Sequence, residues 1–351
     1  MIRVGVVGYG YWGPNIVRNF SDVPGCQLVA VSDMRADRLA SVRSRYPAIR
    51  TFADANALIA DRRIDAVVIV TPVSTHFDLA MQALRAGKHV LVEKPLASNS
   101  EQAARLVEEA DRRGLVLSVD HTFVYTGAVR KMKELVASHA LGDIYYYDSV
   151  RVNLGLFQHD VNVIWDLAVH DLAIMDYVMP WQPVAVSATG MSHLDGEPEN
   201  IAFLTLFFES RLIAHLHVNW LAPVKVRRTL VGGSRKMIVY DDLEPSEKIK
   251  VYDKGVTVSG PDANAAGGKG NGQRYRMLID YRAGDMYAPQ LDIAEALATE
   301  AKHFIQCVEA RQPTLTDGTA GLRVVRVLEA ATQSIAMRGR IVELDVIGCA
   351  A

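Results

Sequence analysis

The first third of the chain alternates short apolar runs with amphipathic segments. The apolar runs are continuous, which is typical of strands buried on both faces of a parallel sheet. Predicted strands occupy residues 2–7, 28–32, 66–70, 88–92 and 115–119. Predicted helices lie between and after them, at residues 14–20, 36–46, 54–60, 76–86 and 98–113. This alternation predicts a doubly wound parallel sheet of the Rossmann type, with right-handed crossovers.

Helix boundaries in this third carry local signals. Gly87 and Gly114 follow two predicted helices and are expected to end them in the left-handed conformation. Ser98 and Glu101 have the spacing of a capping box, so the helix 98–113 is expected to begin there.

The remaining two thirds show strand patterns with few helices between them. We expect strands at 144–152, 184–190, 201–209, 211–220, 226–232 and 236–241, and helices at 128–138, 165–178, 292–309 and 318–337. This pattern predicts an α+β domain with a large, mostly antiparallel open sheet. The predicted domains are therefore residues 1–122 and 123–351, with the helix 318–337 packing back towards the first domain.

Composition and charge exclude several kinds of partner. Half of the 351 residues are hydrophobic and the net charge is −2, without a block of like charge, so we expect neither a nucleic acid nor a membrane as partner. The three cysteines are widely spaced and form no disulfide or metal pattern, which favours the cytoplasm. The glycine-rich segment 260–272 is expected to be a mobile surface loop, either a lid or a hairpin tip.

A glycine motif follows the first predicted strand. Gly8, Gly10 and Gly13 form the pattern G-x-G-x-x-G between a strand and a helix, which permits a tight turn and close approach of a pyrophosphate. Asp33 ends the second strand, 20 positions after Gly13 (33 − 13), where a carboxylate accepts hydrogen bonds from an adenosine ribose. A carboxylate there repels a 2′-phosphate, so we expect NAD rather than NADP. The cofactor contacts predicted from this turn and from the end of the third strand are Gly8, Gly10, Tyr11, Trp12, Gly13, Asp33, Thr71 and Pro72.

A lysine follows the fourth predicted strand. Glu93, Lys94 and Pro95 come directly after the run 88–92, and open parallel sheets bind ligands at the carboxyl ends of their strands. Oxidation of an alcohol needs a base for the hydroxyl proton and a cation or donor for the alkoxide-like oxygen. Lys94 is a candidate for the second role or for passing the proton itself. Glu93 either orients Lys94 or only ends the strand.

The candidate base lies in residues 165–177. Asp166 and His170 are four positions apart, so a helix places them on one face. A carboxylate one turn before an imidazole fixes its tautomer and favours its charged form. On these residues alone, His170 is either a general base or a salt-bridged helix histidine.

Other residues of the second domain are further candidates. Arg151 and Asn153 end a predicted strand and are candidate contacts for substrate hydroxyls or phosphates. Trp165 either stacks on a sugar or nicotinamide ring or packs in the core. His215 and His217 share one face of a strand, but without a third ligand we predict a polar sheet face and no metal site.

Taken together, these motifs resemble the Gfo/Idh/MocA family of nicotinamide-dependent sugar and polyol oxidoreductases. The resemblance covers essentially the whole chain and includes the glycine turn, Thr71-Pro72 with His76, Gly87-Lys88-His89-Val90, Glu93-Lys94-Pro95 and Asp166-x-x-x-His170. It implies that Lys94, Asp166 and His170 are catalytic, and that His76, Glu93 and Lys94 border the cofactor. It also implies a homodimer or homotetramer that uses the open sheet as its interface. The stretch 8–15 further resembles members that act on nucleotide-linked amino sugars in surface-polysaccharide pathways, such as UDP-N-acetylglucosamine 3-dehydrogenases.

One departure concerns the end of the fifth strand. Many family members carry an asparagine and an arginine there, whereas this chain has His121 and Thr122. His121 either contacts the substrate or nicotinamide or is a satisfied loop histidine. The predicted substrate contacts are Lys94, His121, Arg151, Asn153, Trp165, Asp166 and His170.

These observations predict an NAD-dependent dehydrogenase acting on a secondary hydroxyl of a sugar or sugar nucleotide. Two alternatives remain open: an NAD-dependent glycosidase of the same family, which oxidises its sugar only transiently, and a non-enzymatic NAD-sensing regulator. Retention of Lys94, Asp166 and His170 favours catalysis over sensing.

Overall fold

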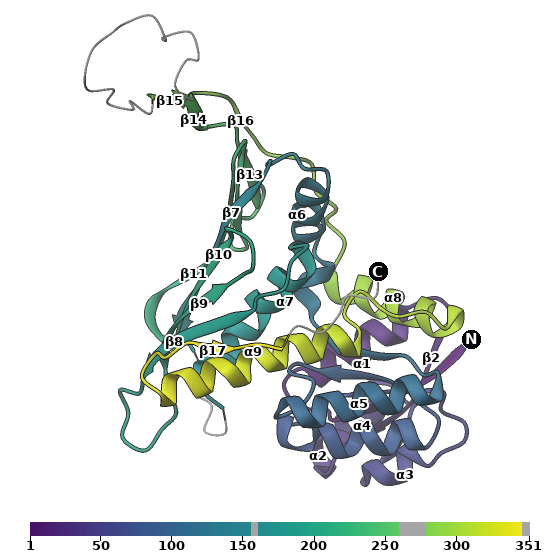
Figure 1. The fold of residues 1–351 in the computed structure, drawn as a ribbon. Coiled ribbons are helices and arrows are strands. Elements are labelled where there is room, and N and C mark those ends of the chain that lie inside the picture. Colours follow the sequence, from purple (N-terminus) through teal and green to yellow (C-terminus); the bar gives the residue numbers. More distant parts are fainter. Residues whose placement is uncertain (156–160, 260–277, 346–351) are drawn as a thin grey trace, which may run out of the picture.

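A six-stranded parallel sheet forms the centre of the first domain in the computed structural model, which describes residues 1–155, 161–259 and 278–345 (Figure 1). The strand order β3-β2-β1-β4-β5-β6 reverses direction between β1 and β4. A reversal of this kind opens a crevice at the carboxyl ends of the strands. The strands are β1 (Ile2–Val7), β2 (Cys26–Ser32), β3 (Arg50–Phe52), β4 (Ala66–Ile69), β5 (His89–Glu93) and β6 (Leu117–Asp120).

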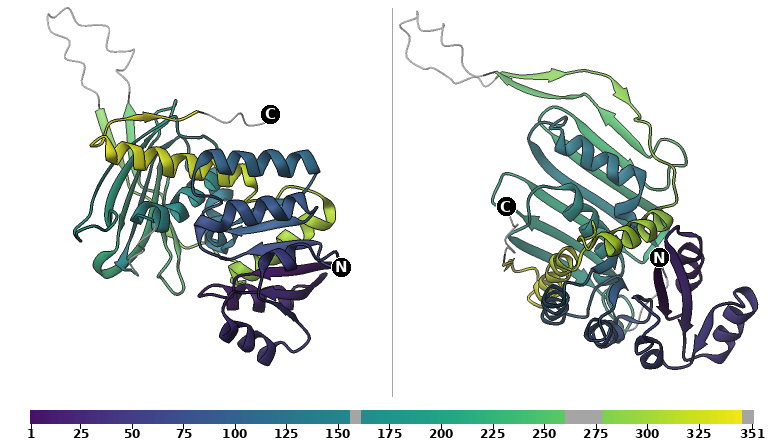
Figure 2. Two further views of the ribbon diagram at one scale, coloured as in Figure 1. Left: turned by 90° about the horizontal axis from the view of Figure 1, so that it is seen from below. Right: turned by 90° about the vertical axis from the view of Figure 1, so that its right-hand side faces the viewer.

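Helices cover both faces of this sheet. One face carries α3 (Ala55–Ile59), α4 (His76–Arg85) and α5 (Ser100–Arg113), which share a core with Leu322 and Val325 of α9 (Gly318–Ala336). The other carries α1 (Gly13–Asp22), α2 (Ala36–Arg45) and α8 (Ala296–Ala310). There Phe20 of α1 meets Phe304 of α8 edge-to-face, with 6.2 Å between ring centroids. The C-terminal part of the chain therefore completes the first domain (Figures 1 and 2).

The start of α5 differs from the sequence prediction. The capping box at Ser98 and Glu101 is wrong: α5 is capped by Asn99, whose side chain accepts a hydrogen bond from the Gln102 N–H at 2.9 Å. The Ser98 hydroxyl turns away, towards the main-chain oxygen of Val73. The predicted glycine ends hold, since Gly114 caps α5 with a φ of +61° and Gly87 follows α4 with a φ of +75°.

A nine-stranded sheet forms the second domain. Its order is β16-β13-β12-β11-β7-β10-β9-β8-β17, and every pairing is antiparallel except β7 with β10. The strands are β7 (Ile144–Leu154), β8 (Ala185–Met191), β9 (Ile201–Phe207), β10 (Ile213–Asn219), β11 (Leu221–Gly233), β12 (Met237–Asp241), β13 (Ile249–Tyr252), β16 (Met286–Tyr287) and β17 (Val342–Glu343). The predicted open, mostly antiparallel sheet is confirmed.

Only one face of the second sheet is covered in the described chain. The helices α6 (Gly127–Ala137), α7 (Val169–Val178) and α9 pack on it, while the other face exposes Phe203 and Ile213. Because α9 also packs on α5 and β6, this helix joins the two domains, as expected for 318–337 (Figure 2). A hairpin of β14 (Gly255–Ser259) and β15 (Leu278–Arg282) projects beyond the sheet, and the segment 260–272 lies outside the described residues (Figure 1).

The helix expected over 165–178 is not a regular α-helix throughout. It opens with a π-helical turn, Ile164–Ala168, before α7 begins. Asn162 supports this turn by accepting hydrogen bonds from the N–H groups of Ile164 and Trp165, at 3.1 and 3.4 Å. Turns of this kind often lie at functional sites, and this one carries Asp166.

Candidate active site

The glycine turn between β1 and α1 has the shape that a dinucleotide requires. Gly8 has a φ of +100°, and a Cβ there would lie 2.3 Å from the Val70 oxygen. A Cβ on Gly13 would lie 2.6 Å from the Gly8 oxygen, so both positions need glycine. A Cβ on Gly10 would meet only the Arg38 guanidinium, at 3.6 Å, so the backbone there faces open space. Helix α1 also begins without a side-chain cap, which leaves its N-terminus available to phosphate.

Asp33 lies at the carboxyl end of β2 beside this turn. Its Oδ2 accepts hydrogen bonds from the Tyr9 N–H at 2.7 Å and the Arg38 guanidinium at 3.2 Å, and its Oδ1 accepts one from the Arg35 N–H. The carboxylate thus ties the glycine turn to the segment after β2. Tyr11 is 91% exposed, whereas the Trp12 indole N–H turns inwards and donates to Asp120.

The turn after β4 forms the next edge of the crevice. Thr71 and Pro72 follow β4, and the side chain of Thr71 is hydrogen-bonded to that of Thr75 at 2.7 Å. His76 is buried, and its ring nitrogens lie 2.8 Å from the main-chain oxygens of Pro95 and Thr71. Because both ring nitrogens face the backbone, His76 braces the ends of β4 and β5 and leaves no ring atom free for a ligand.

Lys94 crosses from the first domain to the second. The peptide bond before Pro95 is cis. The Lys94 ammonium group donates to the main-chain oxygen of Asp166 at 2.9 Å and lies 3.3 Å from its Oδ1. The other carboxylate oxygen accepts a hydrogen bond from the Trp220 indole N–H at 3.0 Å. With side chains 16% and 25% exposed, Lys94 and Asp166 form a partly buried ion pair.

His170 lies next to this pair, but Asp166 does not hold its ring. The carboxylate of Asp166 is committed to Lys94 and Trp220. Burial lowers the pKa of His170 well below its usual range, and the positive charges of Lys94 and Arg151 lower it further. The prediction that Asp166 favours a charged imidazole is therefore wrong. A neutral imidazole, flanked edge-to-face by the Phe123 ring at 5.0 Å, can accept a proton.

His121 lies at the end of β6. It is 3% exposed, and neither ring nitrogen has a hydrogen-bond partner among the described residues. Burial lowers the pKa of His121 to about 4, so its ring is neutral and offers one donor and one acceptor. Glu93, at the end of β5, is partly exposed, but its Oε2 is buried without a partner in the described chain.

The three further substrate candidates occupy different surroundings. Arg151 is buried and forms a two-point ion pair with Asp171, at 2.8 and 3.0 Å, while its Nη1 has no partner among the described residues. Asn153 lies two positions further along β7, on the same face of the strand. The indole N–H of Trp165 donates to Thr332 of α9 at 3.0 Å, and its ring packs against the cores of both domains. Trp165 is only partly buried, so it packs between the two domains and stays a candidate substrate contact.

Sequence reasoning missed several residues of this site. Phe123 lies beside His170 and also 4.6 Å from the Arg151 guanidinium. Trp220 was not a candidate, because nothing in the sequence linked its indole to Asp166. Asp120 was not predicted, although it ends β6 next to His121 and binds Trp12.

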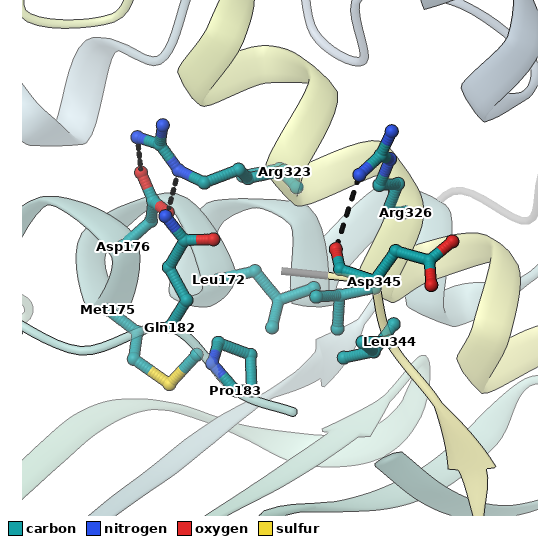
Figure 3. Close-up of a pocket in the computed structure, with 11 residues that line it drawn as sticks. Leu172, Met175, Asp176, Gln182, Pro183, Arg323, Arg326, Leu344 and Asp345 are labelled. Atoms are coloured by element: carbon teal, nitrogen blue, oxygen red, sulfur yellow. Dashed lines mark hydrogen bonds and ion pairs between the residues drawn. The ribbon is translucent and has the colours of Figure 1, made fainter. Parts of the chain in front are cut away.

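Two hollows lie away from this crevice. One is lined by residues of α7, α9 and the segment after β17, with ion-paired Asp176 and Arg323 at its edge (Figure 3). The other lies between α5 and the start of α9. In residues 1–155, 161–259 and 278–345, no cluster of three or more histidine, cysteine or acidic side chains is arranged to hold a metal, and no helix has the length and apolar character to span a bilayer. His215 and His217 instead lie against Phe203 on the open sheet face.

The first domain is built to hold a nicotinamide dinucleotide and supplies Lys94, and the second domain brings Asp166, the ion-pair partner of that lysine, and a neutral His170 to the same crevice. The protein thus belongs to the class of nicotinamide-dependent oxidoreductases. Two family models match it: the GFO/IDH/MocA oxidoreductase family with an NAD-binding Rossmann fold over residues 2–121, and the GFO/IDH/MocA C-terminal domain over residues 129–239. The chain is a member of the Gfo/Idh/MocA family and an NAD(P)-dependent dehydrogenase acting on CH–OH groups.

Relatives within the family are similar over their full length. The UDP-N-acetylglucosamine 3-dehydrogenase of Acidithiobacillus ferrooxidans is 30% identical over 92% of this chain and 94% of its own. Its solved structure superimposes with a TM-score of 0.78 at 26% identity, covering 96% of this chain and 98% of that one. The myo-inositol 2-dehydrogenase of Thermotoga maritima is 25% identical over 99% of this chain and all of its own.

Proposed function

We propose that this protein transfers hydride between NAD and a secondary hydroxyl of a sugar or sugar nucleotide, with the C3 hydroxyl of a UDP-N-acetyl amino sugar as the first candidate. The observation that carries the proposal is the ion pair between Lys94, at the end of β5, and Asp166. This pair lies beside the neutral ring of His170. The substrate class is supported by the similarity to a UDP-N-acetylglucosamine 3-dehydrogenase along 92% of the chain.

Each of these residues has a separate role in the proposal. His170 is the general base: its lowered pKa keeps the imidazole neutral and able to take the hydroxyl proton. Lys94 donates a hydrogen bond to the reacting oxygen and stabilises its developing negative charge. Asp166 acts on Lys94, because its main-chain oxygen and Oδ1 both hold the ammonium group.

The cofactor contacts follow from the geometry of the turns. Gly8, Gly10 and Gly13 with the start of α1 bind the pyrophosphate, and Asp33 meets the adenosine ribose. The turn at Thr71 and Pro72, with Trp12, Glu93 and His121, borders the nicotinamide half, while Tyr11 lies at the outer edge. When bound, NAD supplies the hydride acceptor, and the residues of this chain supply orientation and proton transfer.

A substrate panel tests this function. UDP-sugars, dTDP-sugars and free polyols are each incubated with the protein and NAD, and NADH is followed by its absorbance. We expect net NADH with at least one nucleotide-linked amino sugar, and at least a thousandfold lower rate for Lys94→Ala. Full activity of Lys94→Ala refutes the assignment of the site.

The same panel separates the two alternatives. A glycosidase releases free sugar from a glycoside without accumulating NADH. A sensor binds NADH but shows no turnover with any compound. Either result replaces the proposed dehydrogenase reaction.

We also propose that two copies of the chain associate through the open face of the second sheet. Large apolar side chains on that face are unusual for a free surface, and Phe203 and Ile213 are each more than 40% exposed there. Phe203→Glu places a charge at its centre. We expect light scattering to show a dimer or tetramer for the wild type and a smaller species for this variant; an unchanged mass contradicts the interface.

A further inference from the structure

Three carboxyl groups meet beneath helix α8, next to Lys94. Glu93 and Asp120 are paired in register at the ends of β5 and β6. Glu300 comes from α8, which packs against the turn Thr122–Tyr125 after β6. Glu300 is fully buried, and neither of its carboxyl oxygens has a hydrogen-bond donor among the described residues. A buried carboxylate in this position, without a donor, is costly unless it carries a proton.

The surroundings of Glu300 favour the protonated acid. Burial raises its pKa well above the usual range, and the negative charge of Asp120 raises it further. Thr122 cannot replace the missing donor, because its single hydroxyl hydrogen is used in the 2.5 Å bond to Asp120. The acid proton of Glu300 can therefore join Glu300 to Asp120. Burial and the charge of Asp120 also raise the pKa of Glu93, the third carboxyl group of the cluster.

Asp120 connects Glu300 to the cofactor site. Its Oδ2 accepts a hydrogen bond from the indole N–H of Trp12 at 3.0 Å, and Trp12 is the residue that precedes α1 in the glycine turn. Its Oδ1 accepts the bond from Thr122, which begins the turn after β6. His121 lies between them in sequence, buried and with both ring nitrogens unpartnered in the described chain. Movement of Asp120 would therefore displace Trp12, Thr122 and His121.

We propose that Glu300 is a positioning residue for the nicotinamide end of the cofactor site, acting through Asp120 on Trp12 and on the turn that carries His121. The proposal deepens the function proposed above and rests on the same site. Its mechanism is a hydrogen bond from the Glu300 acid to the Asp120 carboxylate, which fixes the direction of both Asp120 oxygens. No proton leaves the pair during turnover, so Glu300 is not a catalytic residue.

The test measures NADH binding, which does not depend on knowing the substrate. Glu300→Gln keeps a donor of similar shape, whereas Glu300→Leu removes it and leaves Asp120 without a partner on that side. By fluorescence titration we expect Glu300→Gln to bind NADH within about twofold of the wild type and Glu300→Leu about tenfold more weakly. Glu309→Gln, on the exposed end of the same helix, is the matched control and binds as the wild type.

Two results overturn the proposal. One is wild-type NADH binding by a folded Glu300→Leu protein. The other is a Glu300→Gln protein as weak as Glu300→Leu, which would mean that an ionised carboxylate is required. Should Glu300→Leu fail to fold, the infrared difference between wild type and Glu300→Gln decides: a protonated-acid carbonyl band at neutral pH supports the proposal, and its absence refutes it. A protein inactive on the whole substrate panel leaves these binding results valid.

Discussion

Asp166→Asn tests the proposal that Asp166 acts on the reaction through Lys94. The asparagine has the same shape, and its main-chain oxygen still accepts the Lys94 bond of 2.9 Å. Its side chain offers one oxygen and one amide, so it cannot accept from both Lys94 and Trp220, as the carboxylate does. At 3.3 Å and an effective dielectric of about 20, the lost charge attraction is at most on the order of 5 kcal/mol (332/(20 × 3.3)). Solvent and the remaining bond reduce it, and we expect kcat/KM to fall about a hundredfold, roughly 2.7 kcal/mol.

A double-mutant cycle tests whether this loss passes through Lys94. Lys94→Ala alone should cost at least about a thousandfold in kcat/KM. If Asp166 acts only by holding Lys94, the double variant is no worse than Lys94→Ala within about threefold, because the two losses overlap. Asp176→Asn on the same helix, whose partner is Arg323, is the control and should keep wild-type kcat/KM. Losses that multiply in the double variant refute the reasoning and give Asp166 an independent role.

Three further predictions concern pH, cofactor choice and stability. Burial and nearby cations lower the pKa of His170, so its neutral form persists in mild acid. We therefore expect kcat/KM to fall only when the pH drops below the ordinary imidazole pKa of about 6.5. A fall in kcat/KM centred at or above that pH contradicts a neutral His170. Asp33→Ser frees the Arg38 guanidinium, which lies 3.2 Å from the Asp33 carboxylate, to bind a 2′-phosphate. The ratio of the NADP to the NAD dissociation constant should therefore fall at least about tenfold. An unchanged ratio argues against Asp33 as the ribose contact. Phe304→Ala removes a ring packed on Phe20, so denaturant unfolding should show a loss of about 3–5 kcal/mol, and a loss below 1 kcal/mol would mean that α8 is not part of that core.

Local motifs were the part of the site that the sequence could predict. Gly8 and Gly13 are needed because backbone atoms approach each other there, and the order strand, turn, helix places them without any knowledge of distant residues. Strand alternation likewise predicted that His215 and His217 share one face of a strand, and both lie against Phe203 on the open sheet face. These features depend on positions close together in the chain, where spacing alone determines geometry.

Interactions between elements that are distant in the chain could not be predicted from the sequence. The spacing of Asp166 and His170 suggested an acid–histidine pair, because both were placed on one α-helix. The π-helical turn changes that geometry, and two groups from elsewhere, Lys94 and Trp220, take the carboxylate oxygens. Likewise, Ser98 fits a capping pattern, but Asn99 provides the cap because the chain after Pro95 enters the helix one residue later.

The two C-terminal helices support the crevice, which lies between the two sheets. Helix α8 closes one face of the first sheet and brings Glu300 to Asp120, which is 180 positions earlier in the chain (300 − 120). Helix α9 packs on the other face and continues onto the second sheet, where Thr332 receives the Trp165 bond next to Asp166. The two helices therefore support the first sheet from both faces, and α9 carries that support to the π-helical turn in which Asp166 holds Lys94.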